Sequence, residues 1–223
     1  MVEIKFCGMT RPEDAKRAAT FGASYIGVIF AEGPRTLTEA AAREVLAAIP
    51  SDVKRVGVFG RESAREIADR AQRLRLDVVQ LHGDPDADAI ADLRRIHSGD
   101  VWAVVRISEA DIPKHVAELF RTADGVVFDA RVAGKLGGSG VTLPWSQLRG
   151  PLAESRKGGS ARLVLAGGLD AENVVAAIET LHPDVVDVSS GIESRVGIKD
   201  PEKMRAFQRA VLRTRVEPGA PVR

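Results

Sequence analysis

The chain has 223 residues, of which 44% are hydrophobic and 28% charged, as is ordinary for a soluble globular protein. Lys and Arg number 32 against 31 Asp and Glu, and aromatic residues make up only 4%, so neither a nucleic-acid surface nor a basic membrane patch is expected. No apolar run approaches the ~20 residues of a membrane helix. The single cysteine excludes an internal disulfide and a cysteine-rich metal site. Without a signal-peptide pattern, these features predict a cytoplasmic enzyme or binding protein.

Short β-branched runs alternate with Ala-, Arg- and Glu-rich stretches along the chain. The expected strands are residues 2–6, 25–30, 54–59, 77–82, 101–107, 125–130, 162–167 and 184–190. The expected helices are residues 12–21, 39–48, 63–74, 87–96, 110–121, 144–154, 171–181 and 201–212. Eight strand–helix units predict a single parallel (β/α)8 TIM barrel over residues 1–213, with a flexible C-terminal tail at 214–223. A doubly wound open sheet is the alternative, but it usually has fewer strands and a glycine-rich first turn, which is absent here.

Three expected helices carry start signals. Thr10 and Glu13 have the spacing of a capping box before the first helix. Asp170 is a candidate cap for the seventh helix. Asp200 followed by Pro201 predicts the N-cap and first turn of the last helix.

The first strand has one polar face, which carries Lys5 and Cys7. Since the alternate residues are apolar and suit the helix layer, we expect this polar face to point into the barrel, with Cys7 at its mouth. Asp187 lies on the neighbouring eighth strand and is expected to pair with Lys5, because a buried charge without a partner costs several kcal/mol. Lys5 would favour the Cys7 thiolate. The alternative for Cys7 is a small buried hydrophobic residue.

Two further strand ends carry acid–base side chains, at the rim where barrel active sites form. Asp129 closes an apolar strand, a setting that raises the pKa of a carboxyl group and suits a proton donor. The alternative is a helix cap or a solvated carboxylate. His82 closes the fourth strand and is a candidate general base, or a hydrogen-bonded supporting residue.

Glycine-rich loops follow the last two strands, at Gly167–Gly168 and Ser190–Gly191. In this fold these loops often bind phosphate through backbone N–H groups, and glycine permits the close approach. The alternative is that the glycines serve tight turns only. Arg35, after the second strand, is a candidate for binding a carboxylate with its planar fork, or a solvated surface residue. Residues 134–140 lengthen the sixth unit and suggest a cover over the substrate or a flexible insertion.

Taken together, these residues resemble the phosphoribosylanthranilate isomerases of tryptophan biosynthesis. The matching segments occur in family order and cover nearly the whole chain: residues 5–15, 56–59, 79–83, 128–130, 137–140, 165–169, 186–193 and 197–200. The resemblance implies an isomerase of N-(5-phosphoribosyl)anthranilate, which becomes 1-(2-carboxyphenylamino)-1-deoxyribulose 5-phosphate by an Amadori rearrangement. It implies no metal or cofactor. The implied partner is this small phosphorylated aminosugar, without nucleic acid or membrane, and the implied state is a monomer or homodimer.

The resemblance also implies roles for individual residues. Asp129 is the general acid that protonates the ring oxygen, and Cys7 is the general base that takes the C2′ proton. Arg35 meets the anthranilate carboxylate. The remaining substrate-binding positions, which include the phosphate site, are Gln80, His82, Gly138, Gly167, Gly168, Ser190 and Gly191.

Two loops depart from the family pattern. Gly60–Arg61 stands where Val-Asn is common, and Val141–Pro144 lacks the usual Phe-Asp pair. These departures keep open a non-catalytic or altered-specificity phosphosugar-binding barrel. A histidine-pathway aminoaldose isomerase is a weaker alternative, because its aspartates at strands one and five are replaced here by Cys7 and Arg106–Ile107.

Overall fold

The computed structural model describes residues 1–107, 112–130 and 145–214. Eight strands form a closed barrel in chain order, every neighbouring pair is parallel, and β1 pairs with β8 to close it. The strands are β1 (Glu3–Phe6), β2 (Tyr25–Ile29), β3 (Lys54–Phe59), β4 (Val78–Leu81), β5 (Asp100–Ile107), β6 (Gly125–Ala130), β7 (Arg162–Ala166) and β8 (Val185–Val188). The predicted TIM barrel is confirmed, and the doubly wound alternative is wrong.

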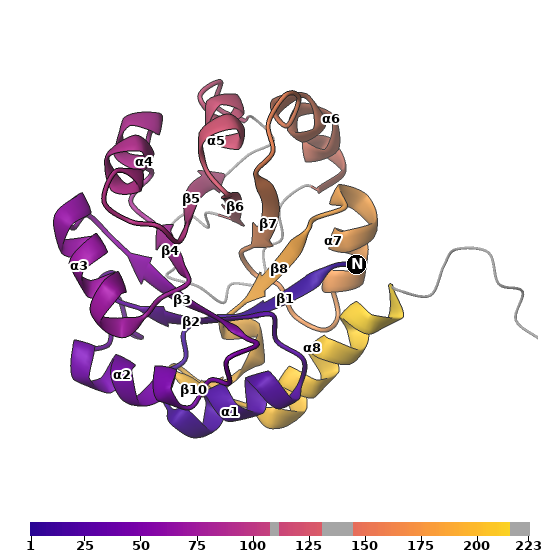
Figure 1. Cartoon of the computed structure of the whole chain (residues 1–223). Coiled ribbons are helices and arrows are strands. Elements are labelled where there is room, and N and C mark those ends of the chain that lie inside the picture. Colours follow the sequence, from indigo (N-terminus) through magenta and orange to yellow (C-terminus); the bar gives the residue numbers. More distant parts are fainter. Residues whose placement is uncertain (108–111, 131–144, 215–223) are drawn as a thin grey trace, which may run out of the picture.

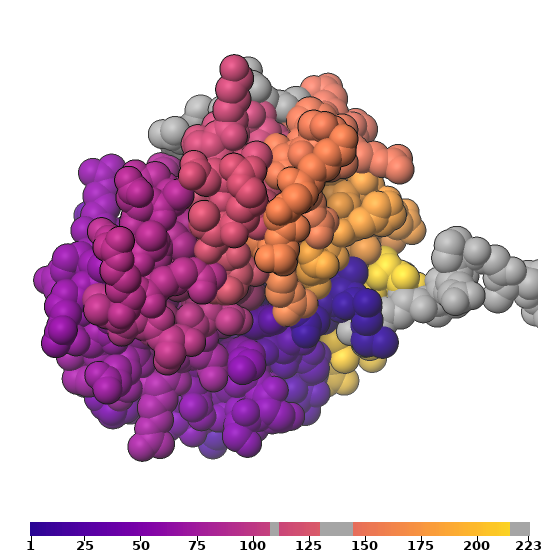
Figure 2. Space-filling model, turned by 45° about the horizontal axis from the view of Figure 1, so that its top comes forward, coloured from indigo at the N-terminus to yellow at the C-terminus, as the bar shows by residue number. Residues whose placement is uncertain are grey.

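The helices surround the strands as an outer ring (Figure 1). They are α1 (Pro12–Thr20), α2 (Glu39–Ala47), α3 (Ala64–Leu74), α4 (Ala87–Arg94), α5 (Val116–Thr122), α6 (Trp145–Ser155), α7 (Val174–Leu181) and α8 (Pro201–Arg213). Figure 2 shows one side of this ring, where units of successive colour lie against one another. Within the described residues, none of these helices has the length and apolar character needed to span a bilayer.

The predicted starts of the first and fifth helices were wrong. In the described part of residues 110–121, Lys114 and His115 form a turn and the helix begins only at Val116. Pro113 accounts for the non-helical state of Ile112 alone, because proline disfavours the helical conformation at the residue before it. Thr10 forms no capping box: its hydroxyl donates to the carbonyl of Gly197, and α1 starts after Arg11 without a side-chain cap.

Of the other two start signals, one is confirmed and one is wrong. Asp200 accepts from the backbone N–H groups of Glu202 and Lys203 at the start of α8, as predicted. Asp170, however, does not cap α7: the N-cap of that helix is Asn173, without a side-chain hydrogen bond, and Asp170 accepts instead from the N–H groups of Glu172 and Asn173 in the preceding turn. Thr214 follows α8, and the rest of the predicted tail lies outside the described residues.

The barrel wall separates two apolar clusters. The larger cluster lies between strands and helices and includes Ile4 and Phe6, both almost fully buried. A smaller cluster fills the interior, formed by Tyr25, Val56, Val78, Trp102, Val104, Val127, Val164, Ala166 and Val185. The alternation expected for β1 is therefore confirmed: its apolar residues face the helices, and Lys5 is fully buried on the other face.

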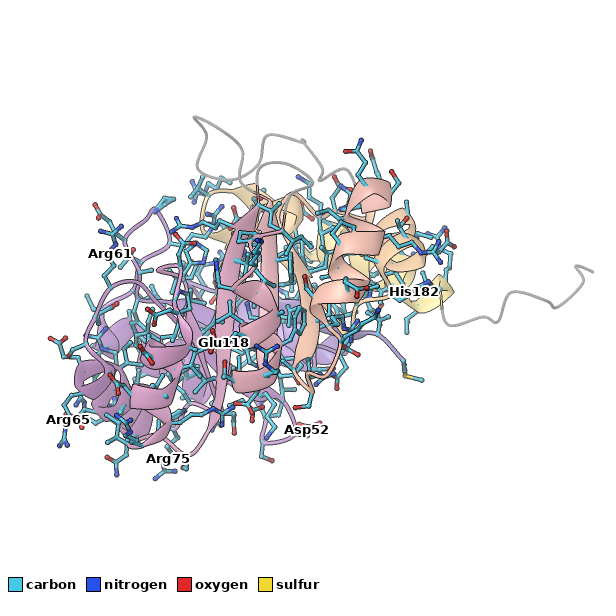
Figure 3. All side chains as sticks on the ribbon, turned by 90° about the horizontal axis from the view of Figure 1, so that it is seen from above. Asp52, Arg61, Arg65, Arg75, Glu118 and His182 are labelled. Carbon is cyan, nitrogen blue, oxygen red and sulfur yellow. The ribbon has the colours of Figure 1, made fainter. Side chains whose placement is uncertain are left out.

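The barrel has two chemically different ends. In Figure 3, Arg61, which follows β3, lies at the upper end, whereas Asp52 and Arg75, which precede β3 and β4, lie at the lower end. The upper end therefore carries the loops that follow the strands, where active sites of this fold form.

Candidate active site

Cys7 and Asp129 lie at the same end of the barrel. Cys7 directly follows β1, with its backbone N–H bonded to the carbonyl of Val188, and Asp129 lies near the end of β6. Strands β7 and β8 separate β6 from β1 around the barrel. The two acid–base candidates therefore stand apart on one rim, facing a common space.

Lys5 and Asp187 form the predicted buried pair. The Lys5 Nζ lies 2.6 Å from Asp187 Oδ2, and the two side chains are 0% and 7% exposed. Burial by itself lowers the pKa of Lys5, but the charges of Asp187 and Cys7 outweigh it and raise that pKa above its ordinary value. Lys5 is thus protonated near neutral pH, beneath the mouth of the barrel.

Cys7 is a buried thiol beside cations. Burial raises its pKa above the ordinary value, and the Asp187 charge adds to that shift, while Lys5 and Lys199 oppose it. The expectation that Lys5 favours the thiolate holds as a direction, but desolvation is the larger effect. The side chain of Lys5 and that of Cys7 also fill the space opposite Gly27, where a Cβ would come within 2.8 Å of Cys7 Sγ. The free protein therefore holds a protonated thiol whose thiolate would be a strong base.

Asp129 has the raised pKa predicted for it. The carboxyl group is partly accessible at the rim, yet protein surrounds it closely enough that burial, with the nearby negative charge of Asp187, raises its pKa to about 6. Lys5 and Arg106 oppose this shift without cancelling it. A carboxyl group with this pKa is partly protonated near neutral pH and can donate a proton.

Three polar side-chain atoms at this end are buried without a hydrogen-bond partner among the described residues. They are Gln80 Oε1, His82 Nδ1 and Asp187 Oδ1. Burial and the charges of Arg106 and Lys5 lower the pKa of His82, so its ring is neutral near pH 7. Buried polar atoms are rarely left unpaired, so these three atoms are available to a ligand or to water. The sequence assigned Gln80 and His82 to substrate binding but gave Asp187 only a structural role.

The loops after β7 and β8 touch each other. A Cβ at Gly191 would lie 2.0 Å from the carbonyl oxygen of Leu169, so only glycine permits this approach. Gly168 has a left-handed backbone (φ +67°), and its carbonyl accepts from Asn173. In the described chain, no protein acceptor takes the N–H groups of Gly167, Gly168, Ser190 or Gly191. Ser190 and Gly191 begin a short 3₁₀ helix, η1 (Ser190–Ile192), whose first N–H groups have no partner within it.

Arg35 does not stand free at the rim. Its Nε and Nη2 donate to the two carboxylate oxygens of Glu193 at 2.7 and 2.6 Å. Glu193 opens a hairpin that the sequence analysis missed, β9 (Glu193–Arg195) with β10 (Ile198–Lys199). Lys199 Nζ, also fully buried, donates to the same carboxylate at 2.9 Å. Glu193 and Lys199 both fall in segments that match the family. That match was the one sequence signal that could have identified them.

Some predicted positions cannot be placed. Gly138, the loop at residues 134–140 and the departing segment 141–144 lie outside the described residues. Within the residues that are described, no group of three or more His, Cys, Asp or Glu side chains could hold a metal ion.

Comparison with known proteins gives one consistent result. Residues 4–210 match the family model described as N-(5'phosphoribosyl)anthranilate (PRA) isomerase. The N-(5'-phosphoribosyl)anthranilate isomerase of Acidithiobacillus ferrooxidans is 39% identical over 208 residues, which cover 93% of this chain and 96% of the relative. The solved structure of the Thermotoga maritima phosphoribosyl anthranilate isomerase superposes with a TM-score of 0.83 at 31% identity, covering 95% of this chain and 99% of that one. A phosphoribosyl anthranilate isomerase solved with reduced 1-(o-carboxyphenylamino)-1-deoxyribulose 5-phosphate gives a TM-score of 0.79 at 30% identity, covering 95% of this chain and 99% of that chain.

Proposed function

The chain belongs to the N-(5'-phosphoribosyl)anthranilate isomerase family and catalyses its Amadori rearrangement, and we propose that Asp129 and Cys7 carry the two proton transfers of this reaction. The observation that carries the proposal is that both groups stand on one rim, apart from each other, around the shared Lys5–Asp187 pair. The reaction needs a proton delivered to the ring oxygen and another removed from carbon, so two separate groups must face the sugar.

Asp129 opens the ring. Its carboxyl proton passes to the ring oxygen, the bond from that oxygen to C1′ breaks, and the nitrogen lone pair forms a C1′=N double bond. The pKa of about 6 suits this role, because a donor works best when its pKa lies near the working pH.

Cys7, in its thiolate form, then removes the C2′ proton and becomes the thiol. The positively charged Schiff base withdraws electrons from C2′, so the electron pair of the broken C–H bond forms a C1′=C2′ double bond while the π pair of the C1′=N bond returns to nitrogen. The resulting enolamine tautomerises to the ketose. Burial raises the pKa of Cys7 and makes its thiolate a strong base, while Lys5 and Lys199 stabilise that thiolate.

The phosphate and the carboxylate of the substrate bind at two places on the rim. We assign the phosphate to the backbone of Gly167–Gly168 and Ser190–Gly191, which is supported by the contact of these loops and by their unpaired N–H groups. We assign the carboxylate to Arg35, whose Nη1 has no acceptor among the described residues. The unpaired atoms of Gln80 and His82 support their predicted part in substrate binding. Gly138 stays a prediction.

We further propose that the enzyme acts on this small molecule in the cytoplasm, without nucleic acid or membrane, as a monomer or homodimer. The nearly equal numbers of basic and acidic residues support the absence of a polyanionic partner. Size-exclusion chromatography with light scattering distinguishes the two oligomeric states.

Turnover by designed variants tests the proton-transfer roles. The purified protein should remove the fluorescence of the anthranilate sugar, and Asp129→Asn should lower kcat by at least the ~10²–10⁴-fold typical of an acid–base group. Cys7→Ser should lose at least as much, because a hydroxyl does not ionise near neutral pH. KM should change little for either variant. His82→Ala is the control: if it is inactive while Cys7→Ser keeps more than about a tenth of kcat, the histidine is the base.

A further inference from the structure

The hairpin β9–β10 is hydrogen-bonded to the loop after β1 and to helix α1. The Thr10 hydroxyl donates to the carbonyl of Gly197, and the backbone N–H of Lys199 donates to Asp14 Oδ2 at 3.2 Å. Asp14 is itself fully buried on α1. Thus the loop that follows Cys7 and the hairpin that follows the phosphate loop form one packed unit.

Within this unit, two cations share one buried carboxylate. Glu193 Oε1 accepts from Arg35 Nε, from Lys199 Nζ and, at 3.3 Å, from the backbone N–H of Gly197, and its Oε2 accepts from Arg35 Nη2. The Glu193 side chain is 5% exposed, so water does not compete for these bonds. The cluster keeps an excess of positive charge beside the barrel mouth.

The cluster also reaches the phosphate loop and the base. Lys199 Nζ donates to the backbone carbonyl of Ser189 at 3.0 Å and lies 3.4 Å from its hydroxyl oxygen. Ser189 directly precedes Ser190–Gly191. A Cβ at Gly8 would lie 2.7 Å from both Arg35 Cδ and Ser189 Oγ, so the residue after Cys7 packs between these two side chains.

We propose that Glu193 and Lys199 are positioning residues, which hold Arg35 in the orientation that binds the substrate carboxylate and fix its place relative to the phosphate loop. This inference rests on the assignment of Arg35 to the carboxylate. The hairpin then sets the distance between the two groups that bind the anionic ends of the substrate, the Arg35 guanidinium and the phosphate loop.

The bidentate contact with Glu193 leaves the Nη1–Nη2 edge of the Arg35 guanidinium available to the substrate carboxylate. Glu193 occupies the Nε–Nη2 edge of the guanidinium, and the Nη1–Nη2 edge can still take a second carboxylate in the same planar geometry. A long side chain that is already ordered loses less rotamer entropy when its ligand binds. The excess positive charge favours an anion at this edge, and no other carboxylate of the described residues bonds to it.

The experiment compares two substrates that differ only in the carboxylate, N-(5-phosphoribosyl)anthranilate and N-(5-phosphoribosyl)aniline. Glu193→Gln should raise KM for the anthranilate substrate by about tenfold or more. This factor corresponds to the usual free energy of a hydrogen bond between charged groups. The kcat of the variant, and its kcat/KM for the aniline substrate, should stay within about threefold. Equal losses on both substrates would show that Glu193 only supports the fold, and would overturn the proposal.

Lys199→Met tests the link to the phosphate loop, with inorganic phosphate as competitive inhibitor. We expect this variant to raise both the KM for the carboxylated substrate and the inhibition constant of phosphate at least fivefold, whereas Glu193→Gln should leave the phosphate constant within twofold. An unchanged phosphate constant in Lys199→Met would overturn the link. Arg195→Met, on the exposed side of the same hairpin, is the matched control and should match the wild type.

A double variant and the turnover of the wild type distinguish failure of this proposal from misfolding and from failure of the proton-transfer scheme. If a single variant does not fold, the pair Glu193→Gln/Lys199→Met removes one charge of each sign and should fold, while still losing the preference for the carboxylated substrate. A double variant that folds and keeps that preference would overturn the proposal. Wild-type protein without turnover would instead refute the proton-transfer scheme, so the two failures are distinguishable.

Discussion

Removing the Asp187 carboxylate should destabilise the protein by about 3–5 kcal/mol at pH 7, the usual cost of leaving one partner of a buried ion pair. Asp187→Ala leaves Lys5 fully buried, and its Nζ loses the partner at 2.6 Å. The loss of unfolding free energy has an upper limit, because the buried Lys5 ammonium can release its proton and become neutral. From an ordinary pKa near 10.4, that release costs about 4.6 kcal/mol at pH 7.

The same reasoning gives a pH dependence. In the variant the folded state binds Lys5's proton more weakly than the unfolded state, so stability rises with pH. At pH 9 releasing the proton costs only about 2 kcal/mol, and the destabilisation should shrink to that value. The wild type keeps its pair over this range, since the Lys5 pKa is raised above its ordinary value and the stabilisation is lost only as pH rises through that raised pKa.

Urea unfolding at pH 7 and pH 9 measures both quantities. The matched control is Asp69→Ala on α3, which removes the exposed partner of Arg65 at 3.0 Å. That pair is solvated, so the loss should stay below about 1 kcal/mol at either pH. A loss below 1 kcal/mol for Asp187→Ala, or a loss that does not diminish at pH 9, would refute the idea that Lys5 is a buried cation held by Asp187.

Two predictions concern the site itself. The value of kcat/KM should rise with pH up to about pH 6 and then level off. Below pH 6 Asp129 is protonated, so activity follows the thiolate fraction of Cys7, which grows with pH. Above pH 6 the fall in protonated Asp129 cancels that growth. The plateau should extend past the ordinary cysteine pKa of about 8.5, and in Cys7→Ser the acidic limb should vanish, with residual activity falling above about pH 6. If that limb persists in Cys7→Ser, the base is another group. Gly168→Val places a side chain at φ +67° where phosphate should meet the backbone, and should raise KM and the inhibition constant of inorganic phosphate at least tenfold. An unchanged phosphate constant in a folded Gly168→Val protein would remove this loop from the site.

Much of the architecture could be predicted from sequence because its causes are local. Short β-branched apolar runs indicated the strands, and the helical stretches between them favoured parallel pairing. In the first strand, the alternation of apolar and polar residues placed Lys5 on the inner face and predicted its pairing with Asp187, since strands one and eight must be neighbours in any closed barrel. Start signals were less dependable: Thr10 had the spacing of a capping box, but its hydroxyl bonds to Gly197, which lies 187 residues away.

The electrostatic character of the site was decided by the tertiary structure. Sequence placed a lysine near Cys7 and predicted a favoured thiolate, but the pKa depends on how much water the whole barrel excludes, and burial raises it instead. Arg35 was expected to be free for a carboxylate, yet Glu193, 158 residues later, takes one edge of its fork. A motif shows that a residue belongs to the site, but it does not show which distant residue will bond to it. Such contacts form only when the eight strands close into the barrel. The order of residues along the chain therefore determined the barrel and the rim that carries the site. Folding determined the pKa values, the ion pairs and the unpaired edges of the side chains on that rim.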